Sequence, residues 1–229
     1  MTKLSERIAD PSLEAKEKEQ LLFLRSAAAT QTHLFKERLQ DILGDAKAVG
    51  KVQILGGHPL RYHETSLVDI TEETDAKIYA VIGDFFHGAS AVTQNAFKAA
   101  IDQSLHSIFA YAALGGKKVQ ALYVIPENGA IVRADAIYWK YSFSEAGVIG
   151  NHQNIFCCLF AKSIVDHTQI NLDELVQIVT AQSGGAEVTE VVNEIRAIWE
   201  KVQGLDKETV FTEYCKTHAL SRHSDNGRA

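Results

Sequence analysis

The strongest pattern in this chain is the run Ile-Phe-Cys-Cys-Leu-Phe-Ala at 155–161, which is apolar at every position. Successive side chains of a strand point to opposite faces of the sheet, so a strand with this pattern must be covered on both faces. We therefore expect 155–161 to be the central strand of a sheet that lies between helices. The same alternation predicts that Cys157 and Cys158 are buried on opposite faces.

Other strands are predicted nearby in the sequence. Residues 118–125 are expected to form a strand, 126–129 a turn and 131–143 a longer strand. One face of the longer strand is predicted to carry Ile137, Trp139, Tyr141 and Phe143, and the other face Tyr138, Lys140 and Ser142. Residues 51–55 and 76–82 are two more strand candidates, the first of them followed by the turn sequence Gly-Gly-His-Pro.

Two helical segments are predicted before these paired strands. Residues 12–43 have helical periodicity and predict one long helix, or two consecutive ones, ending at Gly44. Its recurring apolar residues are Leu21, Leu24, Leu34, Phe35, Leu39, Ile42 and Leu43. An amphipathic helix is predicted at about 89–114, with one face formed by Ile101, Leu105, Ile108, Phe109 and Ala112.

Three more helices are predicted after the central strand. Asn171 and Glu174 stand at the start of 172–182 with nearly the spacing of a capping box. A second helix, 186–203, is expected to bury an apolar stripe formed by Val188, Val191, Val192, Ile195, Ile198, Trp199 and Val202.

The third of these helices is predicted to begin after Asp206, which would act as its N-cap. Four of its residues are expected on one side of the helix: Val210, Phe211, Tyr214 and Cys215. The polar residues 220–229 are expected to form a frayed tail.

The order of these elements predicts an α+β fold. Strands cluster in the middle of the chain, helices lie on both sides of them, and hairpins connect neighbouring strands, which favours a mostly antiparallel sheet over alternating β-α-β units. Because the central strand must be covered on both faces, we expect three layers, α/β/α, with the sheet wrapped by helical layers. The length of 229 residues and the lack of a long linker favour a single domain over 1–229.

Composition and charge argue against some classes of partner and indicate the compartment in which the protein is made. The net charge is −6 and no long basic run occurs, so nucleic acid is not an expected partner. Residues 1–7 lack the apolar segment of a signal peptide, and no apolar stretch is long enough for a transmembrane helix. We expect a protein that is cytoplasmic as synthesised and that, if exported, leaves by a signal-free route.

Common catalytic motifs are missing from the sequence. It contains no phosphate-binding loop, dinucleotide fingerprint, nucleophile elbow or His-Glu-x-x-His motif. The spacing of His58, His63 and Glu64 matches no metal-ligand pattern and predicts a surface loop. His152 and His167 flank the cysteine strand and are also expected in surface loops. We therefore expect no metal and no catalytic residue, and a protein that is not an enzyme.

Three cysteines remain as candidates for chemistry, and a disulfide between the adjacent Cys157 and Cys158 would be badly strained. Free cysteines are most often inert core residues. Catalysis is disfavoured, because the apolar neighbours Phe156, Leu159 and Phe160 oppose thiolate formation. The third use is lipid attachment, for which Cys157, Cys158 and Cys215 are the candidates, with a covalent fatty acid in place of any cofactor.

The arrangement of elements between 97 and 165 resembles the cytolytic δ-endotoxin (Cyt) family. In both, an amphipathic helix (97–114) enters a strand that ends in a short turn (121–128). An aromatic-rich return strand (134–143), a glycine-containing loop and an apolar, cysteine-bearing strand (155–165) follow. A bacterial relative with this kind of fold, the Erwinia virulence factor, is associated with insect gut infection and a fatty-acylated cysteine.

The resemblance leaves 12–43 and 172–219 unmatched. It implies a mostly antiparallel sheet wrapped by helices and, in function, a non-enzymatic bacterial virulence or toxin-like protein that acts at membranes. Its partner would be a lipid membrane or fatty acid, with oligomers allowed on the membrane. Helical layers would leave the sheet at the lipid surface and expose membrane-facing residues, for which the candidates are Ile101, Leu105, Ile108 and Phe109.

A second hypothesis belongs to a different class. The protein would be a cytoplasmic enzyme or small-ligand binder with a pocket between sheet and helices, lined by Tyr138, Trp139, Lys140 and a cysteine. A third interpretation, an interaction protein that packs through its 12–43 helix, also stays open.

Overall fold

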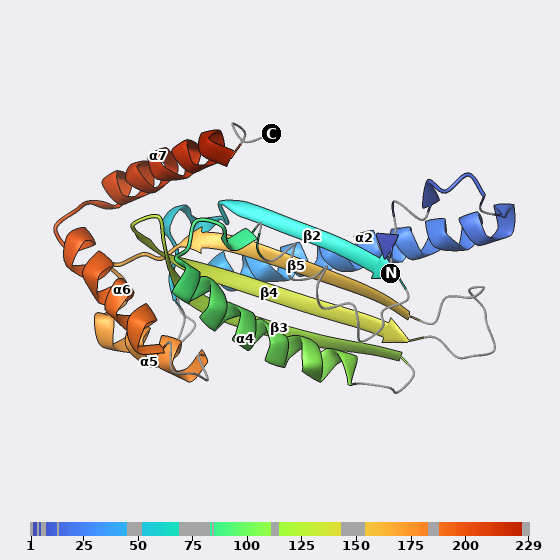
Figure 1. Ribbon diagram of the computed structural model, residues 1–229, viewed down its shortest axis with the longest axis horizontal. Coiled ribbons are helices and arrows are strands. Elements are labelled where there is room, and N and C mark those ends of the chain that lie inside the picture. Colours follow the sequence, from blue (N-terminus) through green and yellow to red (C-terminus); the bar gives the residue numbers. More distant parts are fainter. Residues whose placement is uncertain are drawn as a thin grey trace.

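A five-stranded antiparallel sheet with the strand order β1-β2-β5-β4-β3 forms the middle layer of the protein (Figure 1). The strands are β1 (Thr2–Lys3), β2 (Arg61–Val68), β3 (Gly115–Glu127), β4 (Ala130–Ser142) and β5 (Asn154–Ile164). The structure is a computed structural model that describes residues 2–3, 5, 8–12, 14–44, 52–68, 83, 85–110, 115–142, 154–182 and 188–225.

Strand β5 lies in the centre of the sheet and is buried from Ile155 to Ile164. It pairs with β2 on one side and β4 on the other, so that Cys157 lies between Ser66 and Trp139. Cys158 lies between Thr65 and Tyr138 in the next row. Because adjacent rows point to opposite faces, the two cysteines are on opposite sides of the sheet, as predicted.

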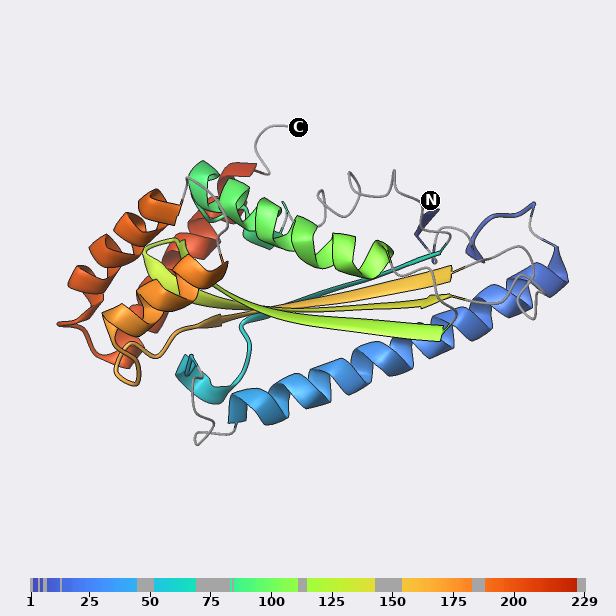
Figure 2. The ribbon, with the colours of Figure 1, turned by 90° about the horizontal axis from the view of Figure 1, so that it is seen from below.

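Two helices cover the two faces of the sheet (Figure 2). Helix α2 (Ala15–Gly44) packs against Ile155, Cys157 and Leu159 of β5. Helix α4 (Ala91–Phe109) packs on the opposite face, where Phe156, Cys158 and Phe160 are buried. The α+β prediction with three layers is therefore confirmed.

Helix α2 is one helix rather than two, and a straight buried stripe runs along it. The stripe consists of Leu21, Leu24, Ala28, Thr32, Phe35, Leu39 and Leu43. Its members are spaced by three, four and four residues, and this pattern repeats every eleven residues. Eleven residues over three turns is about 3.67 residues per turn, close to the period of the α-helix. The stripe therefore keeps facing the sheet along the helix. Leu34 was expected in this stripe, but it is 49% exposed on the outer side.

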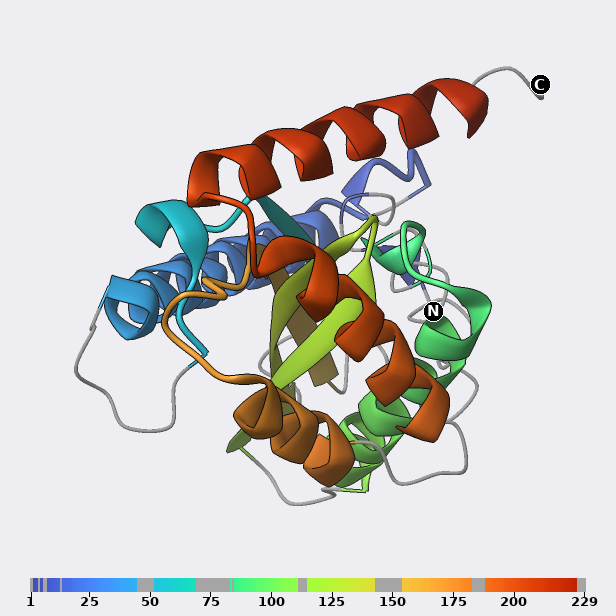
Figure 3. The ribbon, with the colours of Figure 1, turned by 90° about the vertical axis from the view of Figure 1, so that its left-hand side faces the viewer.

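Three helices cover the end of the sheet at which β3 turns into β4 (Figure 3). They are α5 (Leu172–Gln182), α6 (Val188–Val202) and α7 (Lys207–Asp225). The predicted capping box of α5 is confirmed, because the Asn171 side chain accepts from the Glu174 backbone N–H and the Glu174 carboxylate accepts from that of Asn171. Five members of the α6 stripe are buried, namely Val191, Val192, Ile195, Trp199 and Val202.

Two predictions about residues 51–64 were wrong. Residues 52–55 form only an isolated bridge, Ile54 to Val165, and then a short 3-10 turn at Leu55–Gly57. Gly56 and Gly57 both have positive φ, which turns the chain away from a strand path. His63 and Glu64 were expected in a surface loop, yet they belong to β2, whose polar residues are tolerated because most of the strand is only partly buried.

Other predicted segments lie partly or wholly outside the described residues. These are the strand candidate 76–82, the C-terminal end of the 89–114 helix after 110, Phe143, His152 and the end of the tail after 225.

We expect the buried stripe of α2, and not its outer side, to contribute to stability. Replacing the fully buried Leu39 with Ala should lower the free energy of unfolding by about 2–5 kcal/mol. The same change at Leu34, in the same helix but on its outer side, should shift it by less than about 0.5 kcal/mol. Urea unfolding followed by circular dichroism measures both. Equal losses at the two positions would contradict the arrangement.

Candidate functional site

Cys157 lies in the apolar interface between α2 and the sheet. Leu21, Leu24 and Ala28 of α2 surround it, and its side chain is fully buried. The Ser66 hydroxyl donates a hydrogen bond to its Sγ at 3.6 Å. Burial raises the pKa of the Cys157 thiol to about 11, although the bond from Ser66 acts in the opposite direction. The thiol is therefore protonated and shielded at neutral pH.

Cys158 occupies the equivalent position on the α4 side. It belongs to the same buried cluster as Tyr138, Phe156 and Phe160. Burial raises the pKa of its thiol, and the neighbouring Cys157 adds to the increase. Neither adjacent cysteine has the polar, open environment of a nucleophile. A reagent or acyl donor reaches them only if a helical layer leaves the sheet.

Cys215 is the exposed thiol among the three free cysteines. It lies on α7, one helical turn after Phe211, whose side chain is 39% exposed. Val210 and Tyr214, each about 100° around the helix from the residue that follows it, are buried. The four residues were predicted to share one side, and that prediction was wrong: successive helical residues are rotated by about 100°, so Val210 and Tyr214 face inward while Phe211 and Cys215 face outward.

Polar contacts fix the start of α7 next to the end of β5. Asp206 caps the helix as predicted, with its carboxylate accepting from the backbone N–H of Thr209 at 2.8 Å. Lys207 forms an ion pair with Asp166, and a ring nitrogen of His167 contacts the backbone oxygen of Leu205 at 3.2 Å. Burial would raise the pKa of Asp166, but hydrogen bonds from Lys207 and Thr168 outweigh it and leave that pKa lowered.

A buried ionic cluster holds the inner side of α7 to the sheet. Lys162 of β5 lies 2.6 Å from a carboxylate oxygen of Glu127 at the end of β3, and both side chains are almost inaccessible to solvent. The Tyr214 hydroxyl donates to the same carboxylate at 3.2 Å. Burial lowers the pKa of Lys162, and Glu127 offsets part of that effect.

Aromatic rings complete this cluster. The Lys162 ammonium lies 4.8 Å from the ring centroid of Phe85 and 5.4 Å from that of Phe86, within the range of cation–π attraction. Sequence reasoning missed the cluster. Its one signal is Lys162 directly after the apolar run of β5, because a lysine in a buried strand requires an opposite charge.

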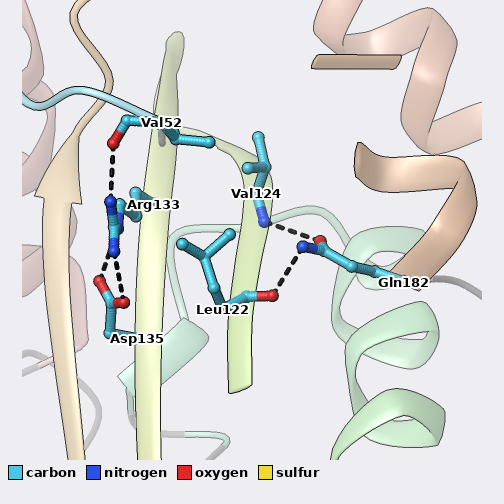
Figure 4. A network of polar contacts seen from close by, with 6 residues as sticks. All are labelled: Val52, Leu122, Val124, Arg133, Asp135 and Gln182. Carbon is cyan, nitrogen blue, oxygen red and sulfur yellow. Dashed lines mark hydrogen bonds and ion pairs between the residues drawn. The ribbon is translucent and has the colours of Figure 1, made fainter. Parts of the chain in front are cut away.

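A second buried network lies on the α2 face of the sheet near β3 and α5 (Figure 4). Arg133 binds the Asp135 carboxylate with two nitrogens, each at 2.8 Å, and donates to the backbone oxygen of Val52 at 2.8 Å. Separately, the Gln182 amide bonds to the outer edge of β3: it donates to the Leu122 oxygen and accepts from the Val124 N–H.

The membrane-facing candidates lie inside the α4 layer in this structure. Ile101, Leu105 and Ile108 are buried against the sheet, and Phe109 packs partly buried beside Phe156. At the C-terminal end of α4 the Lys140 ammonium donates to the Phe109 backbone oxygen at 3.3 Å. Contact of these side chains with lipid therefore requires α4 to leave the sheet.

The N-terminal end of α4 is held by α6. Ser90 and Thr93 both donate to the Glu194 carboxylate at 3.1 Å. Apolar packing supplies most of the remaining contact between α4 and its surroundings.

No group of three His, Cys, Asp or Glu side chains in the described ranges could hold a metal ion. Within these same ranges, none of the helices has both the length and the hydropathy that crossing a membrane requires. His58 is exposed beside η1 (Leu55–Gly57), and His63 is part of β2, close to Phe85.

Comparison with protein-family models, with curated proteins and with solved structures finds no match for this chain. The contacts described above are therefore the basis for a proposed function.

The structure predicts very different reactivity for the three thiols. With a chromogenic aromatic disulfide at neutral pH, the native protein should react rapidly at one thiol and Cys215→Ser at none, because Cys157 and Cys158 are buried and protonated. In denaturant the unsubstituted protein should react at all three. Rapid reaction of native Cys215→Ser would contradict the burial of the other two.

Proposed function

We propose that the protein is a non-enzymatic, virulence or toxin-like protein that acts at membranes, and that Cys215 carries a fatty acyl group. The observation that carries this proposal is the exposed pair Phe211 and Cys215 on the outer side of α7. The adjacent, buried side of that helix is fixed to the sheet through Tyr214 and Glu127. A chain attached at Cys215 would therefore extend away from a firmly held helix.

Attachment would be a thioester exchange. The Cys215 sulfur attacks the carbonyl carbon of a fatty acyl thioester, a new carbon–sulfur bond forms, and the bond to the donor's sulfur breaks. The proton of the Cys215 thiol leaves with the donor's thiol, so that the step needs no oxidant or reductant. Cysteines on amphipathic helices are known acceptors of this modification.

One acyl chain alone gives weak and reversible membrane binding, although each buried methylene contributes about 0.8 kcal/mol. Phe211, which is 39% exposed and lies one helical turn before Cys215, supplies the second apolar contact. With a net charge of −6, we expect no preference for anionic lipids. The bound state would therefore depend on the acyl chain and not on surface charge.

Rearrangement of α4 would follow binding. Transfer of Ile101, Leu105, Ile108 and Phe109 into lipid is favourable by about 25 cal/mol per Å² relative to water. The sheet offers these residues a similar apolar environment, so the exchange is close to balanced. The polar contacts of α4 to Lys140 and Glu194 at its ends, and to Lys117 and Tyr123 between them, are among those that must break. Oligomers on the membrane would cover the sheet face that is left open.

The other hypothesis, an enzyme or ligand binder, has less support. Its pocket would gather Tyr138, Trp139 and Lys140 with a cysteine, but Trp139 packs on the α2 side beside Cys157. Tyr138 packs on the α4 side, and the Lys140 ammonium reaches α4. One pocket between the sheet and a helix cannot be lined by all three. Bacterial virulence and an insect host are supported by the resemblance of 97–165 alone.

Acylation and vesicle binding test the proposal together. The protein is treated with a fatty acyl thioester, and intact mass before and after hydroxylamine reports a thioester. We expect one acyl group on the unsubstituted protein, one on the control Cys157→Ser and none on Cys215→Ser. The acylated protein should co-sediment with phosphatidylcholine vesicles and release an entrapped dye. Acylated protein that stays in the supernatant and leaves vesicles intact from acidic to neutral pH would contradict a membrane function.

A further inference from the structure

The outer edge of β3 has two parts that differ in how their backbone groups are satisfied. β3 is the last strand of the sheet, so only one of its edges pairs with β4. The Val124 N–H and the Leu122 oxygen both bond to Gln182 of α5 (Figure 4). Because backbone groups alternate in direction along a strand, even-numbered residues of β3 point their N–H and C=O groups away from β4.

The first part of the same edge has no such cover. The N–H and C=O groups of Gly116, Lys118 and Gln120 point away from β4, like those of Leu122 and Val124. All three residues are exposed. No residue in the described part of the chain hydrogen-bonds to their outward groups. In Figure 2 this half of β3 lies at the front of the sheet, with α4 on one side and α2 on the other. An edge of this kind is a template for another strand.

Positive charge lies on both sides of this edge. On the α2 side the Lys118 ammonium lies 5.1 Å from the ring centroid of Phe35, and burial and then the nearby Arg38 lower its pKa. No carboxylate in the described ranges forms an ion pair with Lys118 or Arg38. On the α4 side the Lys117 ammonium donates to the Ser107 backbone oxygen at 2.6 Å. Carboxylates placed along the edge would offset the repulsion between Lys118 and Arg38.

We propose that the β3 edge at 115–121 binds an extended, acidic polypeptide segment of a partner protein by strand addition. Backbone hydrogen bonds to Gly116, Lys118 and Gln120 would supply affinity, and pairing of carboxylates with Lys118 and Arg38 would supply selectivity. A second copy of this chain is a poor occupant, because β3 against β3 brings the lysines of both copies together. The proposal is independent of acylation at Cys215.

The competing explanation is that Lys117 and Lys118 only protect the edge from unwanted pairing, as lysines at edges often do. A proline substitution separates the two explanations. Gln120→Pro removes one outward N–H, and the bonds to β4 are left intact. The strand already contains a proline at an even-numbered position, Pro126 opposite Ile131, where the backbone nitrogen also points away from β4. The matched control Gln120→Ala removes the side chain and retains the N–H.

The experiment is a fluorescence-anisotropy titration with labelled peptides of about eight residues, a typical strand length. One peptide alternates Glu and Val, and the other alternates Lys and Val. We expect saturable binding of the Glu-Val peptide, weakened by salt, and none of the Lys-Val peptide. Gln120→Ala should bind like the unsubstituted protein, and Gln120→Pro about tenfold more weakly, the equivalent of one hydrogen bond.

Two more variants keep the test decisive if Gln120→Pro loses its fold, which circular dichroism reports. Lys118→Glu should weaken binding of the Glu-Val peptide and allow binding of the Lys-Val peptide. Gln182→Ala frees the outward groups of Leu122 and Val124, so it should strengthen binding of the Glu-Val peptide. Absence of Glu-Val binding up to millimolar protein, equal binding of both peptides, or edge-dependent dimers in sedimentation would each overturn the proposal.

Discussion

The rest of the structure depends on keeping β5 away from water on both faces. Apolar side chains occupy 155–161 of this strand without interruption, and successive rows point alternately to α2 and to α4. One helical layer would leave half of these side chains exposed, so the sheet requires two. This constraint also accounts for α2: a helix that must follow a long strand needs a straight apolar stripe, and the eleven-residue spacing of Leu21, Thr32 and Leu43 supplies it.

Burial of charge is the second constraint, and it acts at the end of the sheet. Lys162 and Arg133 point to opposite faces. Lys162 is paired with Glu127 of β3, across the intervening β4, and Arg133 with Asp135, two residues further along β4. A buried charge without a partner would be strongly destabilising. The pair on the α4 face also receives the Tyr214 hydroxyl, which orients α7. Exposure of Cys215 is thus a consequence of how Glu127 and Lys162 are satisfied, and it links the core to the proposed lipid attachment.

Local patterns predicted much of this arrangement. The alternation of β5 placed Cys157 and Cys158 correctly, and the spacing of Asn171 and Glu174 predicted a capping box that is present. Strand β2 was missed because most of its positions are half-buried and polar residues occupy them, so no alternation signals a strand. The outward direction of Cys215 was missed because apolar residues fill both sides of that turn of α7. Pairing of Lys162 with Glu127, and of Gln182 with the β3 edge, depends on which strands and helices meet, and residues near each other in sequence carry little of that information.

Amide hydrogen exchange in increasing denaturant measures the central claim most directly, because it gives an opening free energy for each element. If two-sided burial of β5 holds the fold together, amides of 155–164 exchange only through global unfolding, with the largest opening free energy and the steepest dependence on denaturant. Helix α7, which is exposed on its outer side, opens at a lower free energy. Exchange of β5 amides before those of α7, or by an opening that denaturant does not affect, would contradict the claim.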